Sequence, residues 1–410
     1  MTAETISFPL DPGAAALLMR LHAAGHAAYA VGGCVRDSLL GQTPHDWDLC
    51  TSATPEQVLE LFGETHCIPT GLQHGTVTVK HGGELYEITT FRTEGAYSDG
   101  RHPDHVAFVP DVKEDLARRD FTINAMAYNA EEGLIDPFGG QNDLAAGIVR
   151  AVGEPQRRFE EDALRILRLY RFAARFGFAI DPATGQAARA LCSHLDCVSE
   201  ERIAEELSRL LAAPAPGAYL EAEVLAVIFP ELDAAELPES RRILDALEPG
   251  MEHVPIRLAA LLCPLGEAGA RAALKRLKCS NALTGTVATL VREAAAGMPG
   301  AALTLTARRF LSRYDLATIT NLTALCSARH PEQTRAFAAL RAEAERLTAE
   351  NACCRVSQLA VNGRDLMAAG VRPGPGLRQV LNALLEAVIT GQTPNEKDAL
   401  LAAAAQFSAS

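Results

Sequence analysis

The 410-residue sequence lacks the features that mark secreted, membrane-spanning and zinc-binding proteins. Its ten cysteines include no Cys-x-x-Cys pair and have no histidine-rich tract beside them, so neither a zinc site nor a secreted disulfide framework is indicated. No apolar run approaches the ~18–20 residues that cross a bilayer, and the N-terminus has neither the basic start nor the apolar core of a signal peptide. We therefore expect a cytoplasmic protein with reduced thiols and no membrane partner.

Basic residues are also in deficit, since 38 lysines and arginines against 51 acidic residues give a formal net charge of -13. A chain of this sign does not bind nucleic acid through bulk charge, so a polyanion must meet a local basic surface. One segment offers it: residues 150–175 hold seven arginines and four acidic residues, a local excess of three positive charges. We expect phosphates to dock there, with Arg157 and Arg168 as candidate contacts, although solvated ion pairs with acidic neighbours would account for some of these arginines.

Composition divides the chain into a mixed first third and a helical remainder. Residues 68–109 are rich in Val, Thr, Ile, Tyr and Gly, which is typical of strands, and this signal disappears after about Arg150. Apolar spacings of three and four then predict helices at 159–177, 200–212, 241–247, 256–263, 268–277, 283–295, 335–347 and 377–390. The predicted fold class is α+β, with a mixed α/β head followed by a long all-α region.

A glycine pair followed closely by two aspartates is the most informative segment. Gly32 and Gly33 precede a helix-like stretch that contains Arg36, and such a turn lets backbone N–H groups approach phosphate oxygens. Asp46 and Asp48 stand two apart, so on a strand their carboxylates project from one face and can bridge divalent cations. Two cations ~3.5–4 Å apart activate an attacking hydroxyl and stabilise a leaving pyrophosphate. Either feature alone is usually a turn or a solvated loop, but together they predict a nucleotide site.

The combined pattern, G-G-x-V-R-D-x-L-L-G followed by D-x-D, resembles the class II nucleotidyltransferases of the tRNA CCA-adding enzyme and bacterial poly(A) polymerase family. The resemblance covers residues ~27 to 212 strongly and later segments weakly. It implies a polymerase-beta-like head, Mg²⁺ held by Asp46 and Asp48, and Glu87 as a third active-site carboxylate. Taken alone, Glu87 would equally fit a solvent-facing strand position.

Further segments match family motifs in chain order. Residues 118–125 resemble the motif that contacts the sugar and phosphates of the nucleotide, residues 136–144 the hinge between head and neck, and residues 95–103 the flexible loop. An ordinary Pro-Gly loop would also fit the hinge segment. The resemblance implies nucleotide contacts by Gly32, Gly33, Arg36, Arg119, Asp120, Asn124, Asp162, Arg165, Arg168 and Arg171, a hinge at Asp136, Gly139 and Gly140, and loop residues Tyr97, Asp99 and Arg101.

The segment at 161–165, Glu-Asp-Ala-Leu-Arg, resembles the family motif that reads the nucleobase. On a helix Asp162 and Arg165 share a face, and the simplest interpretation is an i, i+3 ion pair. Cytosine and adenine each present an amine donor beside a ring-nitrogen acceptor, which a carboxylate and a guanidinium match. Uracil and guanine present a carbonyl beside a ring N–H, and each mismatched buried group costs ~1–3 kcal/mol. One Asp–Arg pair is therefore expected to select C and A without a nucleic-acid template.

The predicted domains are a catalytic head at 1–149, a helical neck at 150–212, a body at 213–300 and a tail at 301–410 that docks tRNA. The resemblance implies addition of the CCA triplet to tRNA 3′ ends from CTP and ATP. Addition of A only or of CC only, and poly(A) synthesis, stay open as alternatives. A non-catalytic RNA-binding protein on the same scaffold is a further alternative, but such a protein would have no need of metal-bridging carboxylates beside a base-reading pair.

Overall fold

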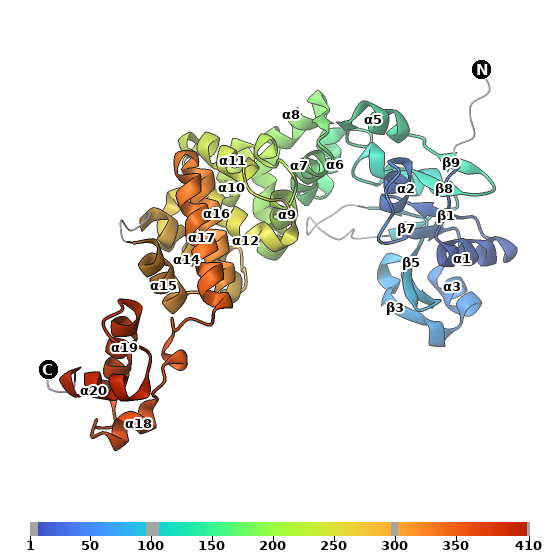
Figure 1. Ribbon diagram of the computed structural model, residues 1–410. Coiled ribbons are helices and arrows are strands. Elements are labelled where there is room, and N and C mark those ends of the chain that lie inside the picture. Colours follow the sequence, from blue (N-terminus) through green and yellow to red (C-terminus); the bar gives the residue numbers. More distant parts are fainter. Residues whose placement is uncertain (1–6, 96–105, 297–301, 408–410) are drawn as a thin grey trace. The chain divides into compact units, whose positions relative to one another are not determined.

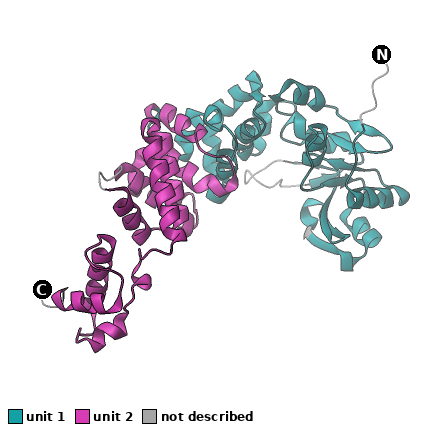
Figure 2. Cartoon of the chain, viewed as in Figure 1, with its two compact units in different colours: residues 1–234 teal, residues 235–410 magenta. Residues whose placement is uncertain are grey.

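The computed structural model describes residues 7–95, 106–296 and 302–407 (Figure 1). The chain forms two compact units, residues 1–234 and residues 235–410 (Figure 2). Unit 1 contains the mixed sheet, and the described part of unit 2 consists of helices and connecting segments. The predicted α+β head followed by a mostly helical remainder is confirmed. The four-domain division stays a prediction.

The head is built on a seven-stranded sheet with the order β3-β4-β5-β2-β1-β8-β9. Neighbouring strands are antiparallel except β2 and β5, which are parallel, so the sheet is mixed. Its strands are β1 (Ala28–Val31), β2 (Leu49–Thr51), β3 (Cys67–Gly71), β4 (Thr76–His81), β5 (Glu84–Thr90), β8 (Ala127–Asn129) and β9 (Gly133–Ile135). Two small ladders pair β6 (Arg92–Glu94) with β7 (Val106–Phe108) and β10 (Ile148–Val149) with β11 (Ala179–Ile180). Strand β11 lies beyond Arg150, where the sequence gives no strand signal.

Helices and the sheet enclose the core of the head, where Tyr29, Cys50 and Phe91 pack with Val112 and Leu116. The helices of unit 1 are α1 (Pro12–Ala23), α2 (Gly33–Leu39), α3 (Pro55–Phe62), α4 (Val112–Ala117), α5 (Gly140–Ala146), α6 (Pro155–Glu161), α7 (Leu164–Phe176), α8 (Pro182–Ala190), α9 (Glu200–Leu211) and α10 (Ala222–Ile228), with single 3₁₀ turns η1 (Glu64–His66), η2 (Leu72–His74), η3 (Thr122–Asn124), η4 (Cys192–Cys197) and η5 (Gly217–Tyr219). Apolar positions three and four apart bury one face of α9 through Ile203, Leu207 and Leu210.

Unit 2 is preceded by a 3₁₀ turn, η6 (Ala234–Glu236), and its helices are α11 (Leu237–Asp245), α12 (Val254–Leu262), α13 (Gly266–Arg276), α14 (Asn281–Ala296), α15 (Leu303–Arg313), α16 (Leu316–Arg329), α17 (Thr334–Ala349), α18 (Gly363–Ala368), α19 (Pro375–Ile389) and α20 (Lys397–Phe407), with η7 (Met251–His253), η8 (Cys263–Leu265), η9 (Pro331–Gln333) and η10 (Val356–Gln358). Two apolar clusters stabilise this unit. One joins α15, α16 and α17, and the other joins α18, α19 and α20. None of the helices in the three described ranges is long and apolar enough to cross a membrane.

The single helix predicted at 159–177 is wrong. It is two helices, because α6 ends at Glu161 and α7 begins at Leu164, with Asp162 in an extended conformation (φ −147°, ψ 103°). The Asp162 carboxylate accepts a hydrogen bond from the Leu164 N–H at 3.0 Å, and an aspartate that bonds to a nearby backbone N–H competes with helix continuation. Asp162 and Arg165 therefore do not share the face of one helix.

The predicted hinge segment forms the start of α5. Both carboxylate oxygens of Asp136 accept backbone N–H groups, from Gly140 at 2.7 Å and from Gln141 at 2.9 Å. Gly139 has a positive φ of 73°, and a Cβ on Gly140 would lie 2.2 Å from the carbonyl oxygen of Thr122. The segment thus needs glycine at both positions, while its role as a hinge stays a prediction.

We expect Gly140→Ala to lower the free energy of unfolding by ~1–3 kcal/mol or more, because the added methyl group overlaps a backbone carbonyl that is held in η3. Gly285→Ala is the matched control. Gly285 lies inside α14 with no atom within 4 Å of an added Cβ, so alanine should stabilise that helix by ~0.5–1 kcal/mol. Denaturant unfolding followed by circular dichroism measures both, and equal stability of Gly140→Ala and the parent would contradict the packing.

Candidate active site

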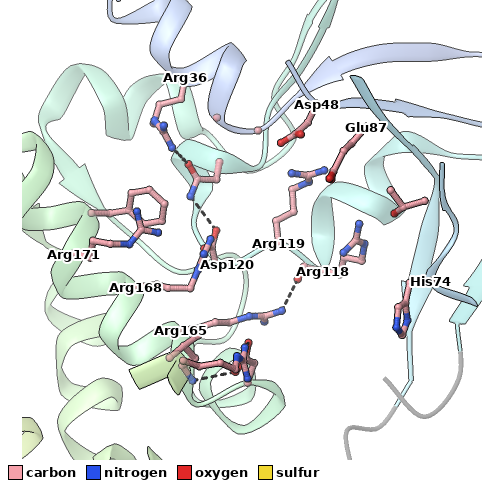
Figure 3. A pocket seen from close by; sticks show the side chains of 18 of the residues that line it. Arg36, Asp48, His74, Glu87, Arg118, Arg119, Asp120, Arg165, Arg168 and Arg171 are labelled. Carbon is pink, nitrogen blue, oxygen red and sulfur yellow. Dashed lines mark hydrogen bonds and ion pairs between the residues drawn. The ribbon is translucent and has the colours of Figure 1, made fainter. Parts of the chain in front are cut away.

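One cavity of about 740 Å³ in unit 1 brings most of the predicted site residues together (Figure 3). This volume is typical of sites for small organic ligands. Nine arginines and four carboxylate residues of the described chain line it, an excess of five positive charges on an acidic protein. The lining includes the predicted residues Gly32, Gly33, Arg36, Asp48, Glu87, Arg119, Asp120, Asn124, Asp162, Arg165, Arg168 and Arg171.

Carboxylates gather at one end of the cavity. Asp48 directly precedes β2, and its carbonyl accepts the N–H of Val31 at 2.9 Å, which extends the pairing of β1 with β2. The parallel register of β2 and β5 pairs Leu49 with Ile88, so Asp48 and Glu87 are neighbours across the two strands. Asp46 does not line the cavity, although it is exposed like Asp48 and its charge acts on Asp48. Both aspartates lie in the segment that precedes β2 rather than within the strand.

The residues at this end suit a hard divalent cation. The protein around the Asp48 carboxylate desolvates it and raises its pKa although the residue keeps exposed surface. Arg119 opposes this shift, and the negative charges of Glu87 and Asp46 raise the pKa further. A bound cation would relieve that repulsion, and carboxylate oxygens are its preferred ligands. Within the described ranges no group of three or more His, Cys, Asp or Glu side chains is arranged to hold a metal by itself. The arrangement fits a cation that takes two carboxylates from the protein and completes its coordination with phosphate and water.

Asp120 is the centre of the opposite, basic wall. One carboxylate oxygen accepts from Asn124 Nδ2 at 3.1 Å, and the other accepts from Arg168 Nη2 at 2.6 Å and Nε at 2.9 Å. Asn124 in turn accepts a hydrogen bond from Arg36 Nη1 at 2.5 Å (Figure 3). Burial alone would raise the pKa of Asp120, but Arg168 and the Asn124 hydrogen bond hold that pKa well below its ordinary value. The carboxylate is therefore ionised and fixes three cavity side chains.

Glu206 on α9 extends this wall. Its carboxylate accepts from Arg171 Nε at 2.6 Å and lies 3.8 Å from Arg168 Nη1, and all but 5% of the residue is buried. Burial lowers the pKa of Arg168, but Asp120 and Glu206 outweigh it and raise that pKa above its ordinary value. Arg168 thus stays charged beside the cavity. Burial lowers the pKa of Arg171, and the charge of Glu206 opposes that shift.

Gly32 lies against Arg119 at the edge of the cavity. Its N–H donates to the carbonyl of Met126 at 3.1 Å. Its φ is 77°, and a Cβ there would lie 2.8 Å from Arg119 Nη1. Glycine at this position makes room for the Arg119 side chain, while its contact with the nucleotide stays a prediction.

Asp162 and Arg165 line the cavity but do not contact each other as an ion pair. The Asp162 carboxylate accepts from the Leu164 N–H and, at 3.0 Å, from Arg202 Nη2. Arg165 donates to Glu161 at 2.9 Å and to the carbonyls of Arg158 at 3.3 Å and Arg118 at 3.0 Å. The i, i+3 pair is therefore not formed, and separate partners hold each side chain.

Other predicted residues lie elsewhere. Tyr97, Asp99 and Arg101 fall outside the described residues. Arg157 does not line the cavity; its side chain is 74% exposed and pairs with Glu161 at 3.3 Å. Asp136, Gly139 and Gly140 belong to the start of α5 and are also not among the lining residues. Arg157 is thus one of the arginines that form solvated ion pairs.

Three family models match this chain. Residues 28–150 match the model of the poly A polymerase head domain, residues 177–236 the model described as a probable RNA and SrmB-binding site of polymerase A, and residues 256–404 that of tRNA nucleotidyltransferase domain 2. The CCA-adding enzyme of Lactiplantibacillus plantarum is 39% identical over 391 residues, which cover 94% of this chain and 93% of the relative. That of Limosilactobacillus fermentum is 37% identical, with 99% of both chains covered.

A solved structure gives the same result. The crystal structure of the Bacillus stearothermophilus CCA-adding enzyme in complex with CTP is 32% identical, with a TM-score of 0.79 and coverage of 97% of this chain and 98% of that one. The chain belongs to the CCA-adding enzyme family. CCA-adding enzymes are tRNA nucleotidyltransferases, and nucleotidyltransferases of this family use divalent metal ions. The carboxylate end and the basic wall of the cavity accord with that chemistry.

Several residues that line the cavity were not predicted from the sequence. Arg118 lies in the motif segment 118–125, Arg175 belongs to the arginine-rich segment, and Arg92 follows Glu87 by five positions, so all three stand near residues that were predicted. His74, whose carbonyl accepts from Arg92, stands in a 3₁₀ turn between two strands. No spacing in the sequence points to Arg202, because only folding brings α9 to the cavity. The remaining additions are Gly71, Thr76, Leu164 and Phe172.

We expect Asp120→Asn to destabilise the protein at pH 7, because Arg168 loses its closest counter-ion. A buried pair that loses one partner costs ~3–5 kcal/mol, and since 32% of the Arg168 side chain is exposed we expect ~2–3 kcal/mol. The folded-state pKa of Asp120 is lowered, so its contribution is complete above ~pH 4 and is lost as the pH falls further toward the folded pKa. Denaturant unfolding at pH 7 and at lower pH should show that the free energies of unfolding of Asp120→Asn and the parent converge as the pH falls.

Glu205→Gln, in the exposed pair with Arg209, is the control and should change the free energy of unfolding little. Equal stability of Asp120→Asn and the parent at pH 7 would contradict the assignment.

Proposed function

We propose that this chain adds CCA to tRNA 3′ ends from CTP and ATP, releasing pyrophosphate, and that one cavity serves all three additions. The observation that carries the proposal is that one cavity is lined by Asp48 and Glu87, by Asp162 and Arg165, and by nine arginines. Figure 3 shows Arg119 and Arg118 between Glu87 and Arg165. A nucleoside triphosphate needs groups of these three kinds. Its phosphates require positive charge, its reacting phosphate requires a metal ion held by carboxylates, and its base requires matched hydrogen-bond donors and acceptors.

The proposed metal is Mg²⁺, held by Asp46 and Asp48, with Glu87 as the third carboxylate of the site. When bound, Mg²⁺ supplies activation of the tRNA 3′ hydroxyl and stabilisation of the pyrophosphate that leaves. Arg36, Arg168 and Arg171 are the proposed partners of the nucleotide's phosphates, since all three line the cavity and two are held by the Asp120 and Glu206 carboxylates. Held guanidinium groups need little reorganisation when an anion binds.

Asp162 and Arg165 retain free hydrogen-bonding capacity for a base. A guanidinium has five N–H donors, and Arg165 uses three in contacts with described residues, which leaves two. A carboxylate has about four acceptor sites, and Asp162 uses two. We propose that Asp162 accepts from the exocyclic amine of cytosine or adenine while Arg165 donates to the adjacent ring nitrogen. Uracil and guanine would place a carbonyl against the carboxylate and a ring N–H against the guanidinium.

The proposed setting is the cytoplasm, which suits a chain whose ten cysteines are all free thiols. The test of the function uses tRNA transcripts that end before, within and after CC, with labelled CTP and ATP supplied separately. Addition of two C residues and then one A supports the proposal. Extension by A alone, by C alone, or by a long A tract would instead identify an A-adding, CC-adding or poly(A)-forming enzyme, and binding without incorporation would identify a non-catalytic protein.

We expect Asp48→Asn to abolish incorporation of both C and A while tRNA binding is retained, because both additions use the same carboxylates. Asp46→Asn should behave alike. Glu84→Gln, an exposed carboxylate on the same strand as Glu87, is the control and should retain activity. Single-turnover incorporation and filter binding of labelled tRNA measure the two effects. Near-parental incorporation in both aspartate variants would remove the metal assignment.

We expect Asp162→Ala to relax discrimination against UTP and GTP by ~10–100-fold, since ~1–3 kcal/mol of mismatch penalty disappears together with one correct contact. The rate with CTP and ATP should also fall. Competition among all four nucleotides on a tRNA that lacks its last three residues measures the preference. If folded and active Asp162→Ala and Arg165→Ala variants keep the parental preference, selection resides elsewhere.

A further inference from the structure

Helix α9 contributes a side chain to the base-reading end of the cavity. Arg202, in the first turn of α9, lines the cavity, and its Nη2 donates to Asp162 Oδ2 at 3.0 Å. The two residues are 40 positions apart, so this contact exists only because α9 packs against α7. Both side chains are mostly buried, with 22% of Arg202 and 16% of Asp162 exposed. The pair is therefore less screened than the exposed ion pairs elsewhere on α9.

Asp162 needs such support because its own backbone does not fix it. The residue lies in the extended break between α6 and α7, and its one local restraint is the Leu164 N–H on Oδ1. Arg202 holds the other oxygen. Two donors from different elements, one on each oxygen, define the plane of a carboxylate, whereas one donor leaves it free to rotate.

Arg165, in contrast, does not depend on α9. Its three contacts are with Glu161 and with the carbonyls of Arg158 and Arg118. The two base-reading side chains are thus oriented separately, Arg165 by its own neighbourhood and Asp162 through Arg202.

We propose that Arg202 is a positioning residue for nucleotide selection, which acts by orienting the Asp162 carboxylate toward the amine of cytosine or adenine. This inference rests on the proposed function. Arg168 is an alternative partner for Asp162, because both line the cavity and the charge of Asp162 contributes to the raised pKa of Arg168. Without Arg202, the carboxylate would turn toward Arg168 and away from the base. A purely structural role, in which the pair only attaches α9 to the rest of the neck, predicts lost stability with unchanged selection.

The test compares Arg202→Gln and Arg202→Lys with Arg209→Gln. Arg209 is the matched control, because it lies on the same helix in an exposed pair with Glu205 and does not line the cavity. We expect Arg202→Gln to raise incorporation of UTP and GTP relative to CTP and ATP by ~3–10-fold, the effect of one lost charge-assisted hydrogen bond. The KM for CTP and ATP should rise by a similar factor with a smaller change in kcat. Arg202→Lys should recover part of the selectivity, and Arg209→Gln should match the parent.

A double-mutant cycle separates the mechanism from simple packing. If Arg202 acts through Asp162, Arg202→Gln should add little to the selectivity loss of Asp162→Ala. Additive effects, or parental selectivity in folded Arg202→Gln, would overturn the inference. Should Arg202→Gln fail to fold, Arg202→Met, which keeps an apolar stem and has no donor for Asp162, takes its place, and parental selectivity in that variant would overturn the inference equally. If the parent protein adds no CCA, the proposed function is contradicted. If the parent adds CCA and Asp162→Ala loses discrimination against UTP and GTP while Arg202→Gln keeps it, this inference alone is contradicted.

Discussion

Mutual repulsion among arginines is the constraint that organises unit 1. Nine guanidinium groups line one cavity, and neighbouring carboxylates offset part of their mutual repulsion. Asp120, after α4, and Glu206, on α9, provide that compensation for Arg168 and Arg171. These contacts join α7 to the head and to α9. Some of the acidic residues of this chain thus compensate the arginines of its basic cavity.

Helix α7 joins the two ends of the site. Arg165, Arg168 and Arg171 follow one another at intervals of three, so they lie along one side of the helix from the base-reading end to the basic wall. The same helix can therefore hold a base and phosphates of one nucleotide in a fixed relation. Under the proposed assignment both ends are built from protein side chains, so recognition of C and A would need no pairing partner. In template-independent addition, protein side chains then take the place of a template base.

The sequence predicted the elements that depend on local pattern and missed those that depend on tertiary contact. The glycine pair, the aspartates and the arginine-rich helix are local patterns, and twelve of the predicted residues line the cavity. The break at Asp162 comes from a local side-chain bond to the Leu164 N–H, which apolar spacing does not reveal. Arg202 reaches the cavity from α9 and contacts Asp162 across 40 positions of sequence. In unit 2 the helices at 268–277, 283–295, 335–347 and 377–390 were predicted to within a few residues. Helices α15 and α16 were not, because their threonines and isoleucine favour strands locally and become helical through burial in the cluster with α17.

The most direct measurement is equilibrium binding of the four nucleoside triphosphates to the protein in the absence of tRNA. The cavity as described predicts that CTP and ATP compete for one site with similar affinity. UTP and GTP should bind at least ~10-fold more weakly, because each leaves mismatched groups against Asp162 and Arg165. Raising the salt concentration should weaken all four alike through their common phosphate contacts. Equal affinity for all four nucleotides, or separate sites for CTP and ATP, would contradict selection by the protein cavity.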